Sequence, residues 1–287
     1  MGTRVLIFKL YIKIAQIISQ YPVGKHSTIV LIHNFIITHL KPKIIEFEGF
    51  KIYLDSSNSL RLSKTPNDMS LQTALIKKTV VQGQNVLDVG AHIGYYSLIM
   101  SKLVGDSGKV YAFEPESKNF ELLKQNIKVN LIKNITPIKK AVVDVNGKLK
   151  VYRSETSQAD HRVYLQKDSK RKTEAVEAIF LDGYFGVKEK IDFVKIDVQG
   201  VEPQVIIGMS EIIKLNKDIK IFIEFWPEGL KLAGFEADKL LSLLEGFGFH
   251  FYDIDEWQYR PIRISKEQLL KKYTVSNKRD TNLLCLR

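Results

Sequence analysis

Two acidic residues, Asp88 and Glu114, lie at or near the ends of two short apolar runs. Their type and spacing are typical of a ligand-binding site. Asp88 lies in the first run, and Glu114 follows the second about twenty residues after Gly94. Gly90 and Gly94 interrupt the chain after the first run and lead into a helical pattern. We expect the missing Cβ atoms at these glycines to let a ligand approach the backbone, where the N–H groups of the following helix face it.

The same residues indicate which ligand this site would accept. Glu114 could accept hydrogen bonds from ribose hydroxyls, and Asp88 suits a cationic group better than a phosphate. The spacing Gly-x-x-x-Gly differs from the Gly-x-Gly-x-x-Gly of dinucleotide enzymes, and no P-loop Gly-Lys-Ser/Thr is present. S-adenosylmethionine has a ribose, an ammonium group and no pyrophosphate, so it fits better than NAD or ATP.

Charged residues also interrupt two later strands. The run Ile191–Val198 contains Lys195 and Asp197, and Glu224 lies near the end of Ile219–Phe225. A central parallel strand is ordinarily apolar on both faces, so charges there are costly unless they are paired or lie at the open carboxyl end. We therefore expect a charged cluster that faces the site, with a purely structural ion pair as the alternative.

Alternating strands and helices must position these residues. Tyr95–Val104 and Ser117–Asn130 have helical periodicity, and Ile135–Val143, followed by Asp144, reads as a third strand. This alternation predicts an α/β doubly wound, mostly parallel sheet with ligands at the carboxyl ends of its strands. Three further alternating segments predict antiparallel strands beside the pocket, at Lys148–Arg153, His161–Gln166 and Glu174–Leu181.

Residues 1–82 are expected to form an N-terminal helical and hairpin cap over a main domain of residues 83–287. Val5–Ile18 is amphipathic, too short and too charged to span a bilayer, and docking against the domain is favoured over peripheral membrane contact. A hairpin and a helix follow in this cap, at Glu46–Leu54 and Ser70–Val81.

Composition bounds the remaining possibilities. The 287 residues, 45% of them hydrophobic, suffice for one large core. The net charge is +11, but lysines and arginines are scattered along the chain, which favours a solvated basic surface over a nucleic-acid stripe. A weak attraction to anionic glycans, lipids or nucleic acid is left open. The single cysteine, Cys285, excludes an internal disulfide framework and points to a reducing compartment, so we expect a cytoplasmic protein.

Four motifs in order resemble the FkbM family of S-adenosylmethionine-dependent methyltransferases: Asp88–Ser97, Phe113–Pro115, Lys195–Glu202 and Ile223–Pro227. The resemblance implies the class I methyltransferase fold, a Rossmann-like sheet of seven strands whose last strand is antiparallel. Phe249–Ile254 would then be the sixth strand and Asn282–Leu286 the seventh. Gln199 departs from the Asp-Val-Glu-Gly-x-Glu pattern of the family, and glutamine can form hydrogen bonds but cannot act as a base.

The resemblance also implies cofactor contacts by position. The methionine part would lie on the loop that contains Asp88, Gly90, Ala91, His92 and Gly94, the ribose on Glu114 beside Pro115, and the adenine near Ala141 and Asp144. Methyl transfer to a hydroxyl further requires an aligned nucleophile and removal of its proton. Asp197 is the first candidate for that base or for orienting the acceptor, with Glu224 and Glu202 behind it. Lys195 is a further catalytic candidate, and Glu202 is also placed on the substrate side.

His161 is the rival base, because its unperturbed pKa is well matched to neutral pH; a hairpin surface position is the equally weighted alternative. Arg162 would hold an anionic group such as a sugar carboxylate, and Trp226, which ends the fifth strand, is placed on the substrate side. The carboxylates of Asp197, Glu202 and Glu224 are of the type that Mg²⁺ accepts, but their spacing does not require a metal.

We expect an O-methyltransferase that acts on a hydroxyl of a sugar, glycan precursor or other small metabolite. No Asn/Asp-Pro-Pro-aromatic motif follows the fourth strand, which disfavours methylation of nucleic-acid bases. A nucleic-acid or protein methyltransferase and a non-catalytic S-adenosylmethionine-binding protein are left as alternatives.

Overall fold

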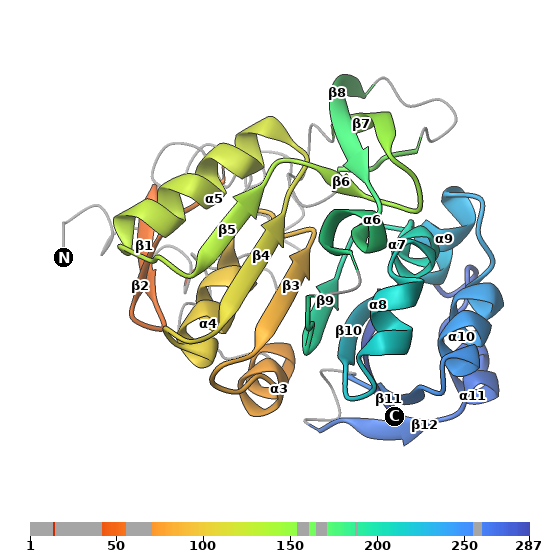
Figure 1. The fold of residues 1–287 in the computed structure, drawn as a ribbon. Coiled ribbons are helices and arrows are strands. Elements are labelled where there is room, and N and C mark those ends of the chain that lie inside the picture. The colour runs from red at the N-terminus through yellow and green to blue at the C-terminus, as the bar shows by residue number, and fades with distance from the viewer. Residues whose placement is uncertain are drawn as a thin grey trace.

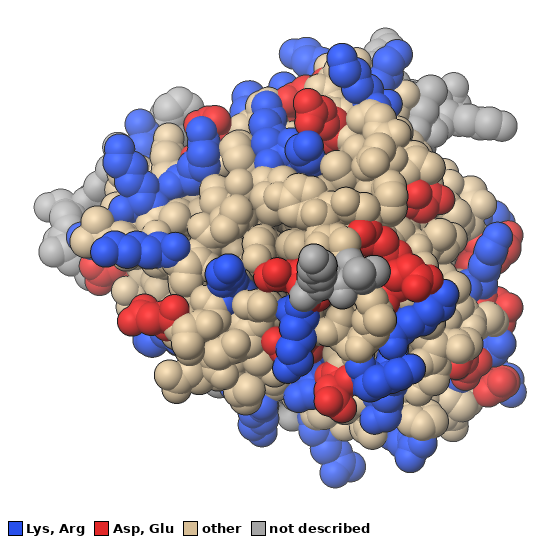
Figure 2. All heavy atoms as spheres, viewed as in Figure 1, with Lys and Arg blue, Asp and Glu red and all other residues tan. Residues whose placement is uncertain are grey.

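An eight-stranded sheet lies at the centre of the molecule, and helices pack on both of its faces (Figure 1). The computed structural model describes residues 14, 42–55, 71–153, 161–164, 171–186, 189–254 and 260–287. The expected amphipathic segment Val5–Ile18 lies outside these residues, apart from Ile14. None of the helices in the described ranges is long and apolar enough to cross a membrane. On the face shown in Figure 2, lysines and arginines are interspersed with acidic residues and do not form a single stripe.

The sheet has the strand order β12-β11-β13-β10-β9-β3-β4-β5. Its members are β12 (Ile262–Ile264), β11 (His250–Asp253), β13 (Thr281–Leu286), β10 (Lys220–Phe225), β9 (Phe193–Ile196), β3 (Asn85–Val89), β4 (Lys109–Phe113) and β5 (Ile135–Ile138). Five neighbouring strands run parallel, namely β10, β9, β3, β4 and β5. Strand β13 is antiparallel to both of its neighbours, β10 and β11. The expected doubly wound fold with an antiparallel last strand is confirmed, and β12 adds an eighth strand at the edge.

Two hydrophobic clusters fill the two faces of this sheet, because alternate residues of a strand point to opposite sides. Val86 of β3 packs in one cluster and Leu87 in the other. The first cluster includes residues of β1 (Ile44–Phe47), β2 (Phe50–Tyr53), α3 (Leu71–Thr79), α4 (Tyr95–Val104) and α5 (Ser117–Val129). The second includes residues of α6 (Leu181–Phe185), α7 (Glu202–Gly208), α8 (Ser210–Leu215), α9 (Pro227–Leu232), α10 (Ala237–Gly246) and α11 (Lys266–Lys272).

The expected hairpin is confirmed as β1 and β2, and it turns through Glu48 and Gly49, both with positive φ. Asn126 of α5 joins it to the main domain: its Oδ1 accepts from the backbone N–H of Tyr53 at 2.6 Å, and its Nδ2 donates to the carbonyl of Ile93 at 2.8 Å. The hairpin therefore shares a core with the sheet domain, and the domain boundary at residue 82 stays a prediction.

A second, three-stranded sheet stands over the carboxyl ends of the parallel strands (Figure 1). It consists of β6 (Ala141–Val142), β8 (Lys172–Ile179) and β7 (Gly147–Arg153). The expectation of one third strand from Ile135 to Val143 is therefore wrong, because the chain leaves the central sheet after Ile138. The apolar run continues across Lys139 and Lys140 into a different sheet, which periodicity alone does not reveal.

The expected strand His161–Gln166 is reduced to one bridge among the residues that the structure describes there. Arg162 pairs with Tyr152 of β7 through two backbone hydrogen bonds of 2.7 and 3.2 Å. Residues 165 and 166 lie outside the described ranges. The segment 161–164 nevertheless lies beside β7.

Candidate functional site

The loop after β3 is bound to the end of β4. The backbone N–H groups of Gly90 and Ala91 both donate to the carbonyl of Phe113, at 3.0 and 2.9 Å. Gly90 has φ 81° and Gly94 has φ 89°, a region that favours glycine. The loop is thus held at the carboxyl edge of the sheet, where α4 begins.

Close approach of the chain to itself explains both glycines. A Cβ atom on Gly90 would lie 1.9 Å from the carbonyl oxygen of Asp197, and one on Gly94 would lie 2.5 Å from Cδ1 of Leu123. Gly90 also lines the pocket, and the expectation that the missing Cβ atoms open the backbone to a ligand stays a prediction. The two glycines allow the loop to pack against the end of β9 and against α5.

Glu114 lies one residue beyond the last pair of β3 and β4, Val89 with Phe113, and is only 5% exposed. One carboxylate oxygen accepts from the backbone N–H of His92 at 2.8 Å, and the other from that of Glu116 at 2.9 Å. Each oxygen of a carboxylate can accept more than one hydrogen bond, so capacity toward a ligand remains. Burial raises the pKa of Glu114 to about 8, and the two N–H donors oppose this shift.

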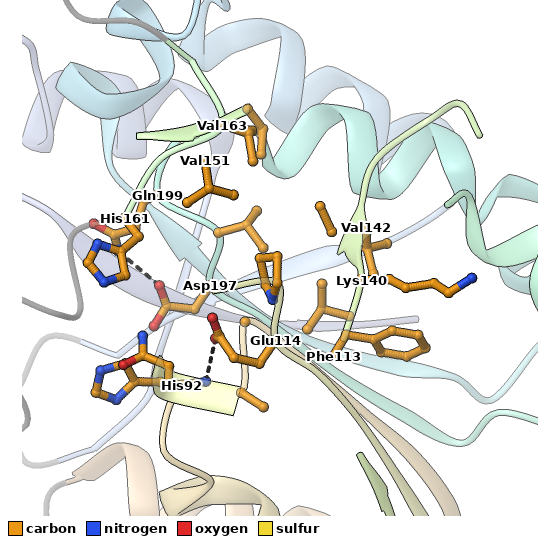
Figure 3. A pocket seen from close by; sticks show the side chains of 18 of the residues that line it. His92, Phe113, Glu114, Lys140, Val142, Val151, His161, Val163, Asp197 and Gln199 are labelled. Atoms are coloured by element: carbon orange, nitrogen blue, oxygen red, sulfur yellow. Dashed lines mark hydrogen bonds between the residues drawn. The ribbon is translucent and has the colours of Figure 1, made fainter. Parts of the chain in front are cut away.

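A pocket opens at the tips of β3, β4 and β9, beneath the small sheet, and hydrophobic residues, together called the apolar slot, form part of its lining. These include Phe113, Ala141, Val142, Val151, Val163 and Val201. In Figure 3, His92, His161, Asp197 and Gln199 gather at one end, and Phe113 and Val142 lie toward the other. The pocket therefore has a polar end, and at its other end Lys140 lies beside Phe113 and Val142.

Lys195 is 4% exposed and forms ion pairs with two carboxylates. Its Nζ lies 3.5 Å from Asp88 Oδ1 and 3.6 Å from Asp197 Oδ2. Burial opposes the charged form, but Asp197, Asp88 and Glu224 outweigh it and raise the pKa of Lys195. Asp88 is fully buried and also accepts from the Ser97 hydroxyl at 2.5 Å, so its cationic partner is Lys195.

Gln199 joins two acidic side chains with one amide nitrogen. Its Nε2 donates to Asp197 Oδ1 at 2.9 Å and to the carboxylate of Glu224 at 3.0 and 3.2 Å. The expected hydrogen-bonding role of this glutamine is confirmed. Burial, followed by the charges of Asp197 and Glu202, raises the pKa of Glu224 well above its usual range.

His92 contributes its backbone to Glu114 and its side chain to the pocket wall. Burial lowers the pKa of the His92 imidazole to about 4, although the nearby carboxylates of Asp55 and Asp197 oppose this shift. The ring is therefore neutral at neutral pH. No group of three or more His, Cys, Asp or Glu within the described ranges is arranged to hold a metal ion.

The residues predicted to contact the cofactor separate into two groups. Those that line the pocket are Gly90, Ala91, His92, Glu114, Pro115 and Ala141; those that do not are Asp88, Gly94 and Asp144. Asp144 instead accepts from Gln204 of α7 at 3.0 Å. It leaves the predicted position because the chain crosses to the small sheet before reaching it.

The predicted catalytic residues are brought together, whereas the predicted substrate residues lie outside the pocket lining. Lys195, Asp197 and His161 line the pocket, and Glu224 is connected to it through Gln199. The predicted substrate residues Arg162, Glu202 and Trp226 are not among the lining residues. Glu202 is 1% exposed, and one of its oxygens accepts from the backbone N–H groups of Val198 and Gly200, at 3.2 and 3.1 Å, so it holds the turn between β9 and α7.

Sequence reasoning missed the apolar slot. Val151 and Val163 reach the pocket from β7 and the segment beside it, far along the chain from the loop after β3. The alternation in β7 shows that it has an apolar face, but no local pattern shows that this face covers a pocket.

Comparisons with known proteins agree on one class. The family model described as "Methyltransferase FkbM domain" matches residues 88–251. A protein-L-isoaspartate O-methyltransferase of Methanococcus maripaludis is 31% identical over 118 residues, 39% of this chain and 52% of that protein. A probable cobalt-precorrin-6B C(15)-methyltransferase of Saccharolobus solfataricus is 39% identical over 67 residues, 23% of this chain and 34% of that protein.

The chain thus spans about half, or less, of the length of these curated relatives. Among solved structures, the methyltransferase FkbM of Methylobacillus flagellatus has a TM-score of 0.47 and 14% sequence identity. The match covers 82% of this chain and 56% of that one.

Proposed function

This chain belongs to the FkbM methyltransferase family, and on that premise we propose that it transfers the methyl group of S-adenosylmethionine to a hydroxyl of a small acceptor. The observation that carries the proposal is the position of Glu114. Its carboxylate is buried at the tip of β4, is oriented by two backbone N–H groups, and lies in the wall of a pocket with an apolar slot.

The residues present fit this cofactor. A carboxylate with acceptor capacity at the end of the second strand suits the two ribose hydroxyls, and the slot that includes Val142, Val151 and Val163 suits a flat, largely apolar base. When bound, S-adenosylmethionine supplies a methyl group that is already activated. The loop from Gly90 to His92 would adjoin its methionine part.

The chemistry left to the protein is to orient the acceptor and to remove its proton. Asp197 is the proposed base, because its carboxylate lines the pocket and is held by Lys195 on one oxygen and by Gln199 on the other. His161, which also lines the pocket, is the alternative base. The small sheet would keep water from the reacting atoms.

We propose a sugar, glycan precursor or other small metabolite as the acceptor. The polar end of the pocket offers carboxylate and amide oxygens, which accept hydrogen bonds from hydroxyl groups. The two curated relatives are named for different acceptors, an isoaspartate in protein and a cobalt-precorrin. The acceptor proposal therefore rests on the site and on the family rather than on those relatives.

A test uses S-adenosylmethionine labelled in its methyl group, incubated with the protein and with cell extract separated into glycan, small-molecule, lipid, protein and nucleic-acid fractions. Label is expected in the glycan or small-molecule fraction, and it should disappear with the Asp197→Asn variant. Transfer into protein or nucleic acid would overturn the proposed acceptor class. Binding of S-adenosylmethionine without label in any fraction would overturn the catalytic proposal.

A further inference from the structure

Arg162 contacts two aromatic rings behind the pocket wall. Its Cζ lies 4.9 Å from the centroid of the Trp226 ring and 5.7 Å from that of Tyr164, and the residue is 8% exposed. A guanidinium within about 6 Å of a tryptophan face is attracted by the ring quadrupole, more strongly where water is excluded. The charge of Arg162 is therefore engaged in packing at a place that does not line the pocket.

Trp226 is itself fixed by glycines. A Cβ atom on Gly229 would lie 2.0 Å from the indole Cε3, so the ring lies directly on the backbone of α9. A Cβ atom on Gly200 would lie 2.5 Å from the Gly229 carbonyl oxygen and 3.2 Å from the Tyr164 ring. Three segments therefore pack closely against one another: the turn between β9 and α7, the start of α9, and the segment 161–164.

The backbone of Arg162 is held from the opposite direction. It exchanges two hydrogen bonds with Tyr152 of β7, of 2.7 and 3.2 Å. The residues on either side of it, His161 and Val163, both line the pocket. The main chain of segment 161–164 thus anchors it to β7, and the side chain of Arg162 anchors it to Trp226 at the start of α9.

We propose that Arg162 and Trp226 form a clasp that holds the segment 161–164 in place as a wall of the cofactor pocket. Both are then positioning residues for cofactor binding, although neither lines the pocket. This inference rests on the proposed function, because it takes the nucleoside of S-adenosylmethionine as the ligand. It replaces the expectation that Arg162 and Trp226 contact the substrate.

The test is calorimetric binding of S-adenosylhomocysteine to the full chain, which needs no acceptor. Trp226→Leu and Arg162→Met should each weaken binding about 10-fold, about 1.4 kcal/mol. Trp226→Phe retains a ring face and should bind within about 3-fold of the wild type. The double variant Trp226→Leu/Arg162→Met should lose less affinity than the sum of the two single losses, since both substitutions remove the contact between Arg162 and Trp226.

The control is Arg287→Met. Arg287 lies 4.6 Å from the centroid of the Phe249 ring, at the amino-terminal edge of the parallel strands, so its loss should leave the affinity unchanged. Additive losses in the double variant, or wild-type affinity in folded Arg162→Met, would overturn the clasp. Where Trp226→Leu does not fold, the comparison of Arg162→Met with Arg287→Met decides. If the wild type binds neither S-adenosylmethionine nor S-adenosylhomocysteine, the proposed function fails instead.

Discussion

The backbone N–H of His92 donates a 2.8 Å hydrogen bond to the carboxylate of Glu114. This bond links the loop after β3 to the tip of β4, two segments that a ligand lying across the strands would touch together. The neighbouring bonds from Gly90 and Ala91 to the Phe113 carbonyl strengthen the same link. The loop and the carboxylate therefore form one preorganised unit.

Replacing Glu114 tests this unit directly. Glu114→Gln keeps the size of the side chain but removes its charge, and we expect about 10- to 100-fold weaker binding of S-adenosylmethionine, since a hydrogen bond to a charged group is worth about 1.5–3 kcal/mol. Glu114→Ala should weaken binding at least as much. Calorimetry measures the affinity, and a thermal melt excludes loss of folding. Unchanged affinity in both variants would remove Glu114 from the site.

Binding should depend on pH through the same residue. Burial raises the pKa of Glu114 to about 8, and hydroxyl donors favour its charged form, so binding should release a proton and strengthen as the pH rises from about 6 to 8. Calorimetry in buffers of different ionisation enthalpy measures the proton release. Glu114→Gln should show neither effect; an equal pH slope in this variant would contradict the assignment.

The stability of the ligand-free protein should change in the opposite direction. Between the usual Glu pKa of 4.5 and the folded-state value of about 8, the native state binds the proton and the unfolded chain does not. Glu114 therefore makes the free energy of unfolding fall as the pH rises through this window. Denaturant titrations of the wild type and of Glu114→Gln measure the difference, and parallel pH profiles would disagree with this expectation.

Gly90 should tolerate no side chain. Gly90→Ala would place a Cβ atom 1.9 Å from the Asp197 carbonyl oxygen at a backbone φ of 81°, so both the fold and cofactor binding should weaken, and Gly90→Val should be worse. Gly248→Ala is the matched control, because its φ is 86° and nothing lies within 4 Å of the added atom. The control should lose only the cost of the left-handed conformation, about 1–2 kcal/mol. Equal losses of unfolding free energy in the two alanine variants would show that the clash is absent.

Asp197→Asn should separate binding from turnover. The amide keeps the shape of the side chain but cannot accept a proton from a hydroxyl, so S-adenosylmethionine should bind within about 3-fold of the wild type while turnover falls by about 100-fold or more. The assay compares calorimetric affinity with the rate of labelled methyl transfer. Full turnover in this variant would shift the role of base to His161.

The strands and helices between Asn85 and Val129 follow directly from the sequence, because period and glycine punctuation agree there. The helix Tyr95–Val104 was predicted with its observed bounds, and the charges in β9 and β10 were correctly expected to form a cluster. The sequence did not predict that the chain crosses to a second sheet after Ile138, because an apolar run looks the same in either sheet. Contacts across long separations, such as the stack of Arg162 on Trp226, leave no periodic signal.

Calorimetric titration of the purified chain with S-adenosylmethionine, and separately with NAD, measures the central claim most directly. If Glu114 binds S-adenosylmethionine at the tips of β3 and β4, titration with S-adenosylmethionine should give saturable heat and titration with NAD should give none. Heat with NAD and none with S-adenosylmethionine would contradict it.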